Sequence, residues 1–570
     1  NEWYRVLANA YLSIKPIERL EYKLSLSGDV RYSNDYLKLT KKHPYGSPKG
    51  EITDFRSLSQ NYLFDNTLTY TKSVRDFNFT ALGGYSMQEQ SINSSSIVGK
   101  DFPSPAFDYV NAAGYIKSAA TTGSSNRLIS TFFRLNMGYA DRYLLTLSIR
   151  ADGSSKFASG NKWGTFPSAS AAWRASSEAF YPENAWISDL KLRASWGMTG
   201  NQEGIGDYDS RSLASGGQNY NGMDGIAVTT LANAELKWEK SDQTNIGVDL
   251  SILKGKITAS ADFFIKNTND LLYDRPLHAT TGFTSITQNI GSMRNTGFEF
   301  TLASHNLTRT DFTWDTQFNI STVKNELTSL IDERPIPVGK HVLQVGKAIG
   351  SFYMYQMEGI YQKDIEVPQA LYQKGVRAGD IRYTDVNGDG NLSPEDKVVV
   401  GKPLPDFYGG LTNRFTFYNF DLTIFNTFSV GNDVYSSGMS GIDAVGHYNY
   451  GIRKEVAQHR WQGEGTSSSV PRAMISTHNT QVSTYLLHDG SYFKFKDVTL
   501  GYTFPAMLTQ KWGISNLRLY ASAQNLWTIS SYPGYDPEVS YSVNDSKTMG
   551  EDAMTVPQLR TFVFGLNINF

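Results

Sequence analysis

Hydrophobic and polar residues alternate with a period of two along most of this chain. Successive side chains of a β-strand point to opposite faces, so this alternation predicts strands with one apolar face. A tilted strand needs ~9–11 residues to cross a bilayer. The end of the chain has that length, and one face of it consists of Phe562, Phe564, Leu566, Ile568 and Phe570. A soluble sheet would also explain this segment alone, but its recurrence along the chain favours a transmembrane antiparallel β-barrel.

The recurring pattern predicts an all-β chain with about 17 membrane crossings, arranged as hairpins and one final strand. Hairpins are expected at residues 4–30, 60–86, 130–152, 163–197, 238–268, 290–321, 407–432 and 490–530. Long polar loops are expected at about residues 28–60, 86–126, 197–237, 266–289, 322–406, 434–489 and 531–556. Short turns at one end and long loops at the other are typical of outer-membrane barrels. The apolar face that should meet lipid includes Leu145, Leu147, Ile149, Ile257, Ala259, Phe298, Phe312, Phe564 and Ile568.

The composition supports a β-barrel and argues against helical membrane proteins, cysteine-based sites and nucleic-acid binders. Hydrophobic residues make up 40% of the 570 residues, as expected if half of each strand faces water, and aromatic residues reach 13%. No run of ~18 apolar residues predicts a transmembrane helix. Cysteine is absent, and the net charge of −2 gives no basic stripe for nucleic acid. No signal peptide is visible although an outer-membrane protein needs one, so the chain is expected to be truncated.

Four segments resemble the SusC/RagA type of TonB-dependent transporter found in Bacteroidetes. They are residues 144–170, 190–202, 289–300 and 385–396, and the resemblance extends over the whole chain. It implies that residues 1–570 are the C-terminal portion of a ~22-stranded barrel, from about strand 6 to about strand 22. The plug domain and the first strands would then be missing.

The resemblance also implies a function. Such a protein would reside in the outer membrane of a Gram-negative bacterium and import oligosaccharides or oligopeptides. Its partners would be a SusD-like surface lipoprotein, which the loops 322–406 and 434–489 are long enough to contact, and the TonB complex, which acts through the plug. A passive porin or a structural barrel remains the alternative, because all of these proteins share the same kind of wall. The chain contains no G-x-S-x-G, H-E-x-x-H or P-loop motif, and it is not expected to be an enzyme.

One loop has the ligand spacing of an EF-hand calcium site. Oxygen-bearing residues occur at positions 1, 3, 5, 7 and 12 and a glycine at position 6, which predicts a structural calcium ion as the cofactor. The five residues are Asp385, Asn387, Asp389, Asn391 and Asp396. Position 12 is Asp instead of Glu, and a series of Asx-turns is the alternative explanation. The strand predicted to follow this loop, at about residues 407–417, is expected to run towards the periplasm. The loop is therefore expected on the external side.

Aromatic residues gather in the last long loops. Planar rings there could contact substrate or a lid protein, or they could form a small core that keeps a long loop ordered. The residues are Tyr435, Tyr448, Tyr450, Trp461 and Tyr535. The final strand, Phe562 to Phe570, is expected to be recognised by the barrel-assembly machinery during insertion and then to contact outer-membrane lipid.

Overall fold

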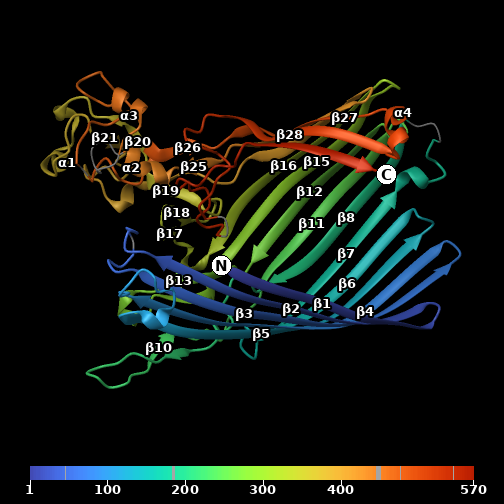
Figure 1. Cartoon of the computed structure of the whole chain (residues 1–570), viewed down its shortest axis with the longest axis horizontal. Coiled ribbons are helices and arrows are strands. Elements are labelled where there is room, and N and C mark those ends of the chain that lie inside the picture. The colour runs from blue at the N-terminus through green and yellow to red at the C-terminus, as the bar shows by residue number, and fades with distance from the viewer. Residues whose placement is uncertain (45, 183–185, 444–450, 476, 543–544) are drawn as a thin grey trace. The chain divides into compact units, whose positions relative to one another are not determined.

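A computed structural model describes residues 1–570 apart from 45, 183–185, 444–450, 476 and 543–544 (Figure 1). Seventeen strands belong to one large antiparallel sheet. They are β1 (Glu2–Ile17), β2 (Leu20–Leu39), β3 (Glu51–Val74), β4 (Phe77–Lys100), β5 (Tyr115–Tyr139), β6 (Tyr143–Ser154), β7 (Trp163–Arg174), β8 (Ile187–Asn201), β11 (Glu239–Ile252), β12 (Ile257–Asn269), β15 (Gly291–Thr308), β16 (Phe312–Leu330), β23 (Phe407–Phe417), β24 (Phe420–Val430), β27 (Tyr492–Thr503), β28 (Asn516–Ser530) and β29 (Thr561–Asn569). The predicted fold class and the predicted number of crossings are both confirmed.

Short and long connections alternate along most of the chain, as predicted, although residues 155–162, between β6 and β7, form a shorter connection than residues 175–186, between β7 and β8. The short ones include residues 18–19, 75–76, 140–142 and 418–419, and the longest are 331–406 and 431–491. In the turn between β5 and β6, Ala140 and Asp141 both have positive φ, 52° and 54°. Two consecutive residues with φ > 0 characterise the tight hairpin turns whose twist matches that of the flanking strands.

Two of the predicted loops are wrong in extent. Most of residues 28–60 and 86–126 is strand, because β2 runs to Leu39, β3 starts at Glu51, β4 runs to Lys100 and β5 starts at Tyr115. β3 and β4 each contain 24 residues, more than twice the ~9–11 that span a bilayer. Their outer portions are polar on both faces, for example Ser94 to Ser96, so period-two apolar alternation could not reveal them.

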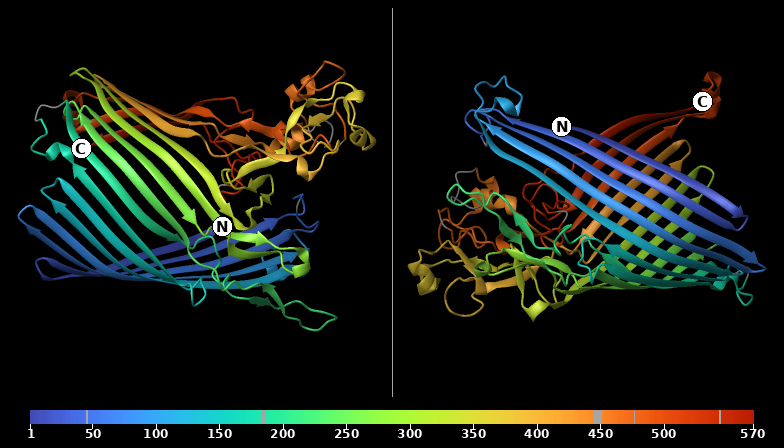
Figure 2. Two further views of the ribbon diagram at one scale, coloured as in Figure 1. Left: turned by 180° about the vertical axis from the view of Figure 1, so that it is seen from behind. Right: turned by 90° about the horizontal axis from the view of Figure 1, so that it is seen from below.

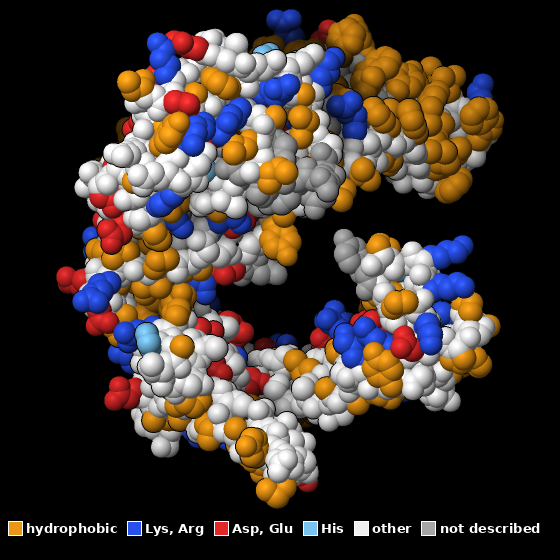
Figure 3. Space-filling view, turned by 90° about the vertical axis from the view of Figure 1, so that its left-hand side faces the viewer, with side chains coloured by type: hydrophobic (Ala, Val, Ile, Leu, Met, Phe, Trp, Pro, Cys, Tyr) orange, Lys and Arg blue, Asp and Glu red, His pale blue; other side chains and the backbone are white. Residues whose placement is uncertain are grey.

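The two faces of the strands differ as the alternation predicts. On β6, Leu147 and Ile149 are exposed (40% and 48%). On the opposite face the Ser148 and Ser168 hydroxyls lie 2.6 Å apart, and Arg150 donates to Asp152 at 2.7 Å. Broad stretches of hydrophobic side chains are visible on the surface (Figure 3). An exposed apolar face opposite a hydrogen-bonded polar face is what a strand between lipid and water requires.

The chain divides into two compact units. Unit 1 comprises Asn1–Glu178, Arg193–Thr244 and Thr268–Ile290, and unit 2 comprises Ala179–Leu192, Asn245–Asn267 and Gly291–Phe570. In unit 1 the strands β2 to β5 run side by side as long ribbons (Figure 2). A buried hydrophobic cluster of this unit includes Trp238 and Phe166, whose rings pack edge to face with their centroids 5.5 Å apart. Among the described residues no helix is long and apolar enough to cross a membrane.

Candidate functional site

The three long connections of unit 2 fold together into a structure that we call the loop module. It consists of the described parts of residues 331–406, 431–491 and 531–560. Its short elements include β19 (Ser351–Tyr355), β20 (Met357–Ile360), β21 (Ile381–Tyr383), β25 (Asp433–Tyr435) and β26 (Leu487–Asp489), which lie close together beyond the ends of β16, β24 and β27 (Figure 1). Buried side chains from different connections meet in one cluster: Phe352, Met354, Tyr435, Met439 and Leu486. The loop module therefore has its own hydrophobic core.

A buried ion pair joins the first two connections of the loop module. Asp380 is completely buried and accepts two hydrogen bonds from the guanidinium of Arg472, at 2.8 and 2.9 Å. The Asn479 side-chain amide and the Arg377 backbone N–H donate to the same carboxylate, both at 2.9 Å. Every lone pair that burial would leave unsatisfied thus has a donor. Removing one partner of such a pair is strongly destabilising, because the other charge is then left alone in a poorly solvated place.

The last connection is attached to the first one through Glu551. Its carboxylate accepts a hydrogen bond from Lys340 at 2.6 Å and lies 3.3 Å from Nε2 of the buried His341. Burial raises the pKa of the Glu551 carboxyl, but the hydrogen bonds from His341 and Lys340 outweigh it and hold the pKa below its usual value. Two backbone bonds attach the last connection to the second one as well, from the Tyr435 N–H to the Gly550 carbonyl and from the Asp552 N–H to the Tyr435 carbonyl, both 2.9 Å.

A second buried cluster fixes the last connection to the barrel wall. Lys494 on β27 is 1% exposed, and its ammonium lies 2.9 Å from Asp536 and 2.7 Å from Glu538. Lys496, two residues along the strand, also contacts Glu538, at 2.8 Å. The sequence analysis predicted neither this cluster nor the ion pair between Asp380 and Arg472. In each case the partners are separated by dozens of residues, so spacing along the chain carries no signal.

The predicted aromatic contact residues have different environments. Tyr435 is 2% exposed and belongs to the hydrophobic core, and burial raises the pKa of its phenol. Trp461 is half-buried against a second cluster, and its indole N–H donates to the Gln362 side chain at 3.3 Å. Both rings therefore help to form the core of the loop module, which was the alternative explanation, and Tyr435 cannot present its face to a ligand.

Of the other three predicted aromatic residues, the structure describes one. Tyr535 is 78% exposed. Tyr448 and Tyr450 lie outside the residues that the structure describes. Of the five predicted residues, Tyr535 is thus the one whose ring is seen to be accessible.

The predicted calcium loop forms a tight turn. Asp385 accepts hydrogen bonds from the backbone N–H groups of Gly388 and Gly390, at 2.8 and 2.7 Å. Asp396 is completely buried and accepts from Val386 and Ser393, at 3.0 and 2.8 Å. Asn391 accepts from Lys374 at 3.1 Å. Across the described parts of the chain, no group of three or more acidic or histidine side chains is arranged to hold a metal. Calcium binding by this loop stays a prediction.

The final strand β29 has the exposure that its predicted role requires. Phe562, Phe564 and Leu566 are all exposed, and Phe564 faces Ala521 of β28 across the register. Recognition of this strand by an assembly machinery stays a prediction.

Comparison with known proteins identifies the family. Residues 7–526 match the family described as "TonB dependent receptor-like, beta-barrel". The chain is 33% identical to TonB-dependent receptor P3 of Formosa agariphila, over 99% of this chain and 58% of that protein. It is 32% identical to TonB-dependent receptor SusC of Bacteroides thetaiotaomicron, over 80% of this chain and 45% of that protein.

A solved structure gives the same result for the fold. The RagAB peptide transporter superposes with a TM-score of 0.87 at 25% identity, covering 100% of this chain and 62% of that one. The chain thus spans less than two thirds of the length of each of these proteins, and its numbering from strand 6 to strand 22 stays a prediction. The chain belongs to the TonB-dependent receptor-like β-barrel family, is of the SusC/RagA type, and is an outer-membrane protein of a Gram-negative bacterium.

Proposed function

We propose that this barrel takes part in TonB-dependent import of oligosaccharides or oligopeptides across the outer membrane. The observation that carries the proposal is the family match over residues 7–526. The named relatives are TonB-dependent receptors, and the similar solved structure is a peptide transporter, so a transport function is better supported than catalysis. A glycan and a peptide both remain candidate substrates.

The loop module is the proposed surface for a SusD-like lipoprotein. Its first two connections share one core and are joined by Asp380 with Arg472, and Glu551 with Lys340 attaches the third connection. A partner that binds a preordered surface loses less conformational entropy than one that must first order long loops. Co-purification of the lipoprotein with the wild-type protein, and its loss when Asp380 is replaced by Ala, would support this assignment.

A deletion strain tests the import proposal most directly. Growth should fail on one class of defined oligosaccharide or peptide and recover when the complete gene is restored. Removing TonB should cause the same defect in cells that contain the intact transporter. Unimpaired uptake without TonB would leave only the passive porin.

Two further partners follow from the position of β29 and of the apolar strand faces. We propose that the barrel-assembly machinery recognises the exposed Phe562–Phe570 segment and that outer-membrane lipid covers the face containing Leu147 and Ile149. We also propose that the loop from Asp385 to Asp396 binds calcium as a structural ion, which the EF-hand spacing and the sharp turn at Gly390 (φ 73°) support.

A further inference from the structure

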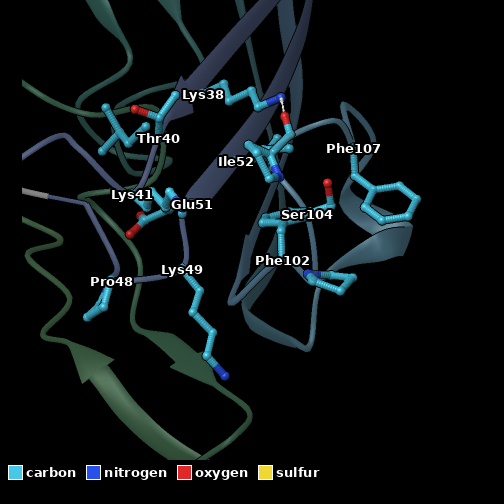
Figure 4. Close-up of a pocket in the computed structure, with 14 residues that line it drawn as sticks. Lys38, Thr40, Lys41, Pro48, Lys49, Glu51, Ile52, Phe102, Ser104 and Phe107 are labelled. Carbon is cyan, nitrogen blue, oxygen red and sulfur yellow. Dashed lines mark hydrogen bonds between the residues drawn. The ribbon is translucent and has the colours of Figure 1, made fainter.

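A cavity of about 310 Å³ lies in unit 1, where two neighbouring hairpins end. One side is formed by the connection between β2 and β3, residues 40–50, and the other by the connection between β4 and β5, residues 101–114. Figure 4 shows Lys41, Pro48 and Lys49 on the first side and Phe102, Ser104 and Phe107 on the second. Neither the family nor the import proposal assigns a role to this cavity.

The two sides are held together by direct hydrogen bonds. The Ser47 hydroxyl donates to the Asp101 carboxylate, and the Asp101 N–H donates to the Gly50 carbonyl at 3.1 Å. Lys38 reaches across and donates to the Pro105 carbonyl at 2.7 Å (Figure 4). The cavity is therefore preformed, and a ligand would not have to order its walls.

The charges around the cavity do not cancel. Lys38 pairs with Asp108 at 2.6 Å, and Glu51 pairs with Lys100 at 2.9 Å. Lys41 and Lys49 also line the cavity, and among the described residues neither has an ion-pair partner. Two ammonium groups thus remain available to an anion, while the only carboxylate in the lining is already neutralised.

The rest of the lining suits a sugar ring. Ile52 and Phe102 are buried beneath the cavity, and Pro48, Pro103 and Pro105 provide apolar surfaces against which C–H groups can pack. Thr40 and Ser104 supply hydroxyl groups that can pair with hydroxyls of a ligand. The volume is at the lower end of ligand pockets, which fits one ring and not an oligomer.

We infer that this cavity binds a single acidic sugar residue, one that carries a carboxylate, phosphate or sulfate, with Lys41 and Lys49 as the anion-binding groups. Such a residue could belong to a soluble acidic saccharide or to the lipopolysaccharide that surrounds an outer-membrane protein. Both sources present the same chemistry, so the experiment has to separate them. The inference does not depend on import.

The test uses the complete protein purified in detergent at low salt, since exposed charges are screened by salt. Saturation-transfer NMR measures binding of glucuronate, with glucose as the uncharged comparison. The wild type should bind glucuronate saturably and glucose at least about tenfold more weakly. A Lys41→Ala, Lys49→Ala double variant should bind glucuronate at least about tenfold more weakly than the wild type, as expected for loss of two charge-assisted contacts.

Lys42→Ala is the matched control, because Lys42 lies in the same connection but does not line the cavity. It should bind glucuronate as the wild type does. Heat-modifiable gel mobility shows whether each variant is folded. Equal binding of glucuronate and glucose, undiminished binding by the double variant, or no saturable glucuronate binding by the wild type would overturn the inference.

A second measurement identifies the source of the sugar. If lipopolysaccharide occupies the cavity, wild-type protein should co-purify with more of it than the double variant does. Equal lipopolysaccharide content, together with the glucuronate result above, assigns the cavity to a soluble acidic saccharide.

Discussion

In the long hairpins of unit 1, each residue is held by the strand beside it. β3 pairs with β4 continuously from Glu51 opposite Lys100 to Val74 opposite Phe77. In the loop module of unit 2, order comes instead from residues far apart in the chain, such as Asp380 with Arg472 or Lys340 with Glu551. A wall built from local pairing should tolerate the loss of single side chains, whereas the loop module should depend strongly on a few of them.

The largest expected effect is at the buried ion pair of the loop module. Asp380→Ala leaves Arg472 without its partner, which costs about 3–5 kcal/mol for a buried pair. We expect faster proteolysis and faster hydrogen–deuterium exchange throughout residues 377–384 and 470–480, while the barrel keeps its heat-modifiable mobility.

The control for this variant is Lys363→Ala. Lys363 and Glu464 form an exposed ion pair at 3.0 Å between the same two connections, and exposed pairs contribute little. If both variants loosen the loop module equally, the buried pair is not what holds it together.

A charge on the apolar face should disturb the wall. Leu147→Lys places an ammonium on the face that we assign to lipid and should destabilise the barrel by about 2–4 kcal/mol near the middle of the membrane. Ser148→Lys changes the opposite face of the same strand and should cost much less. Urea titration in lipid vesicles, followed by gel mobility, measures both, and equal costs would contradict the assignment of the two faces.

Acid should loosen the loop module before it affects the wall. Burial lowers the pKa of His478, whose Nε2 lies 2.8 Å from the Ile381 carbonyl. Because the folded pKa lies below the unfolded one, His478 contributes stability that is present above about pH 6.5 and is lost as the pH falls below it.

Once the exchange rates are corrected for the intrinsic rate at each pH, the protection of residues 377–384 should therefore fall between pH 7.5 and pH 5 in the wild type. His478→Gln cannot titrate and should show a smaller pH dependence. His459→Gln, which changes an exposed histidine of the same connection, should behave as the wild type does. An unchanged pH profile in His478→Gln would assign the effect to another group.

The smallest effect is expected from calcium. A site with a dissociation constant of about 10⁻⁴–10⁻³ M would stiffen residues 385–396 at millimolar calcium and release them on chelation. Asp389→Asn retains an oxygen that can accept the hydrogen bond from Asn391 but removes one ligand charge, so it should weaken the calcium response without breaking the turn. Glu395→Gln, at a position without a ligand role, is the control. If chelation leaves exchange in this loop unchanged in the wild type, the turn alone explains the motif.

The wall could be predicted from the sequence because its rule is local. Alternation at Phe562–Phe570 or Leu145–Ile149 shows within a few residues which face is apolar, and all seventeen strands were found in this way. The outer halves of β2 to β5 were missed because a strand that leaves the membrane no longer needs an apolar face. The loop module was out of reach for another reason: nothing near Tyr435 in the sequence indicates that its ring packs with Phe352 and Met439.

The way in which the long connections leave and rejoin the sheet has an evolutionary consequence. Ser429 pairs with Tyr492, so residues 431–491 begin and end at neighbouring positions of paired strands. Such a connection can grow or shrink among descendants without shifting the register of a single strand. However, it shares a core and the Asp380–Arg472 ion pair with residues 331–406, and its Tyr435 backbone is hydrogen-bonded to Gly550 and Asp552, so it cannot diverge alone. Homologues should inherit these three segments as one block, and recombination between relatives should succeed where the exchanged piece carries all three.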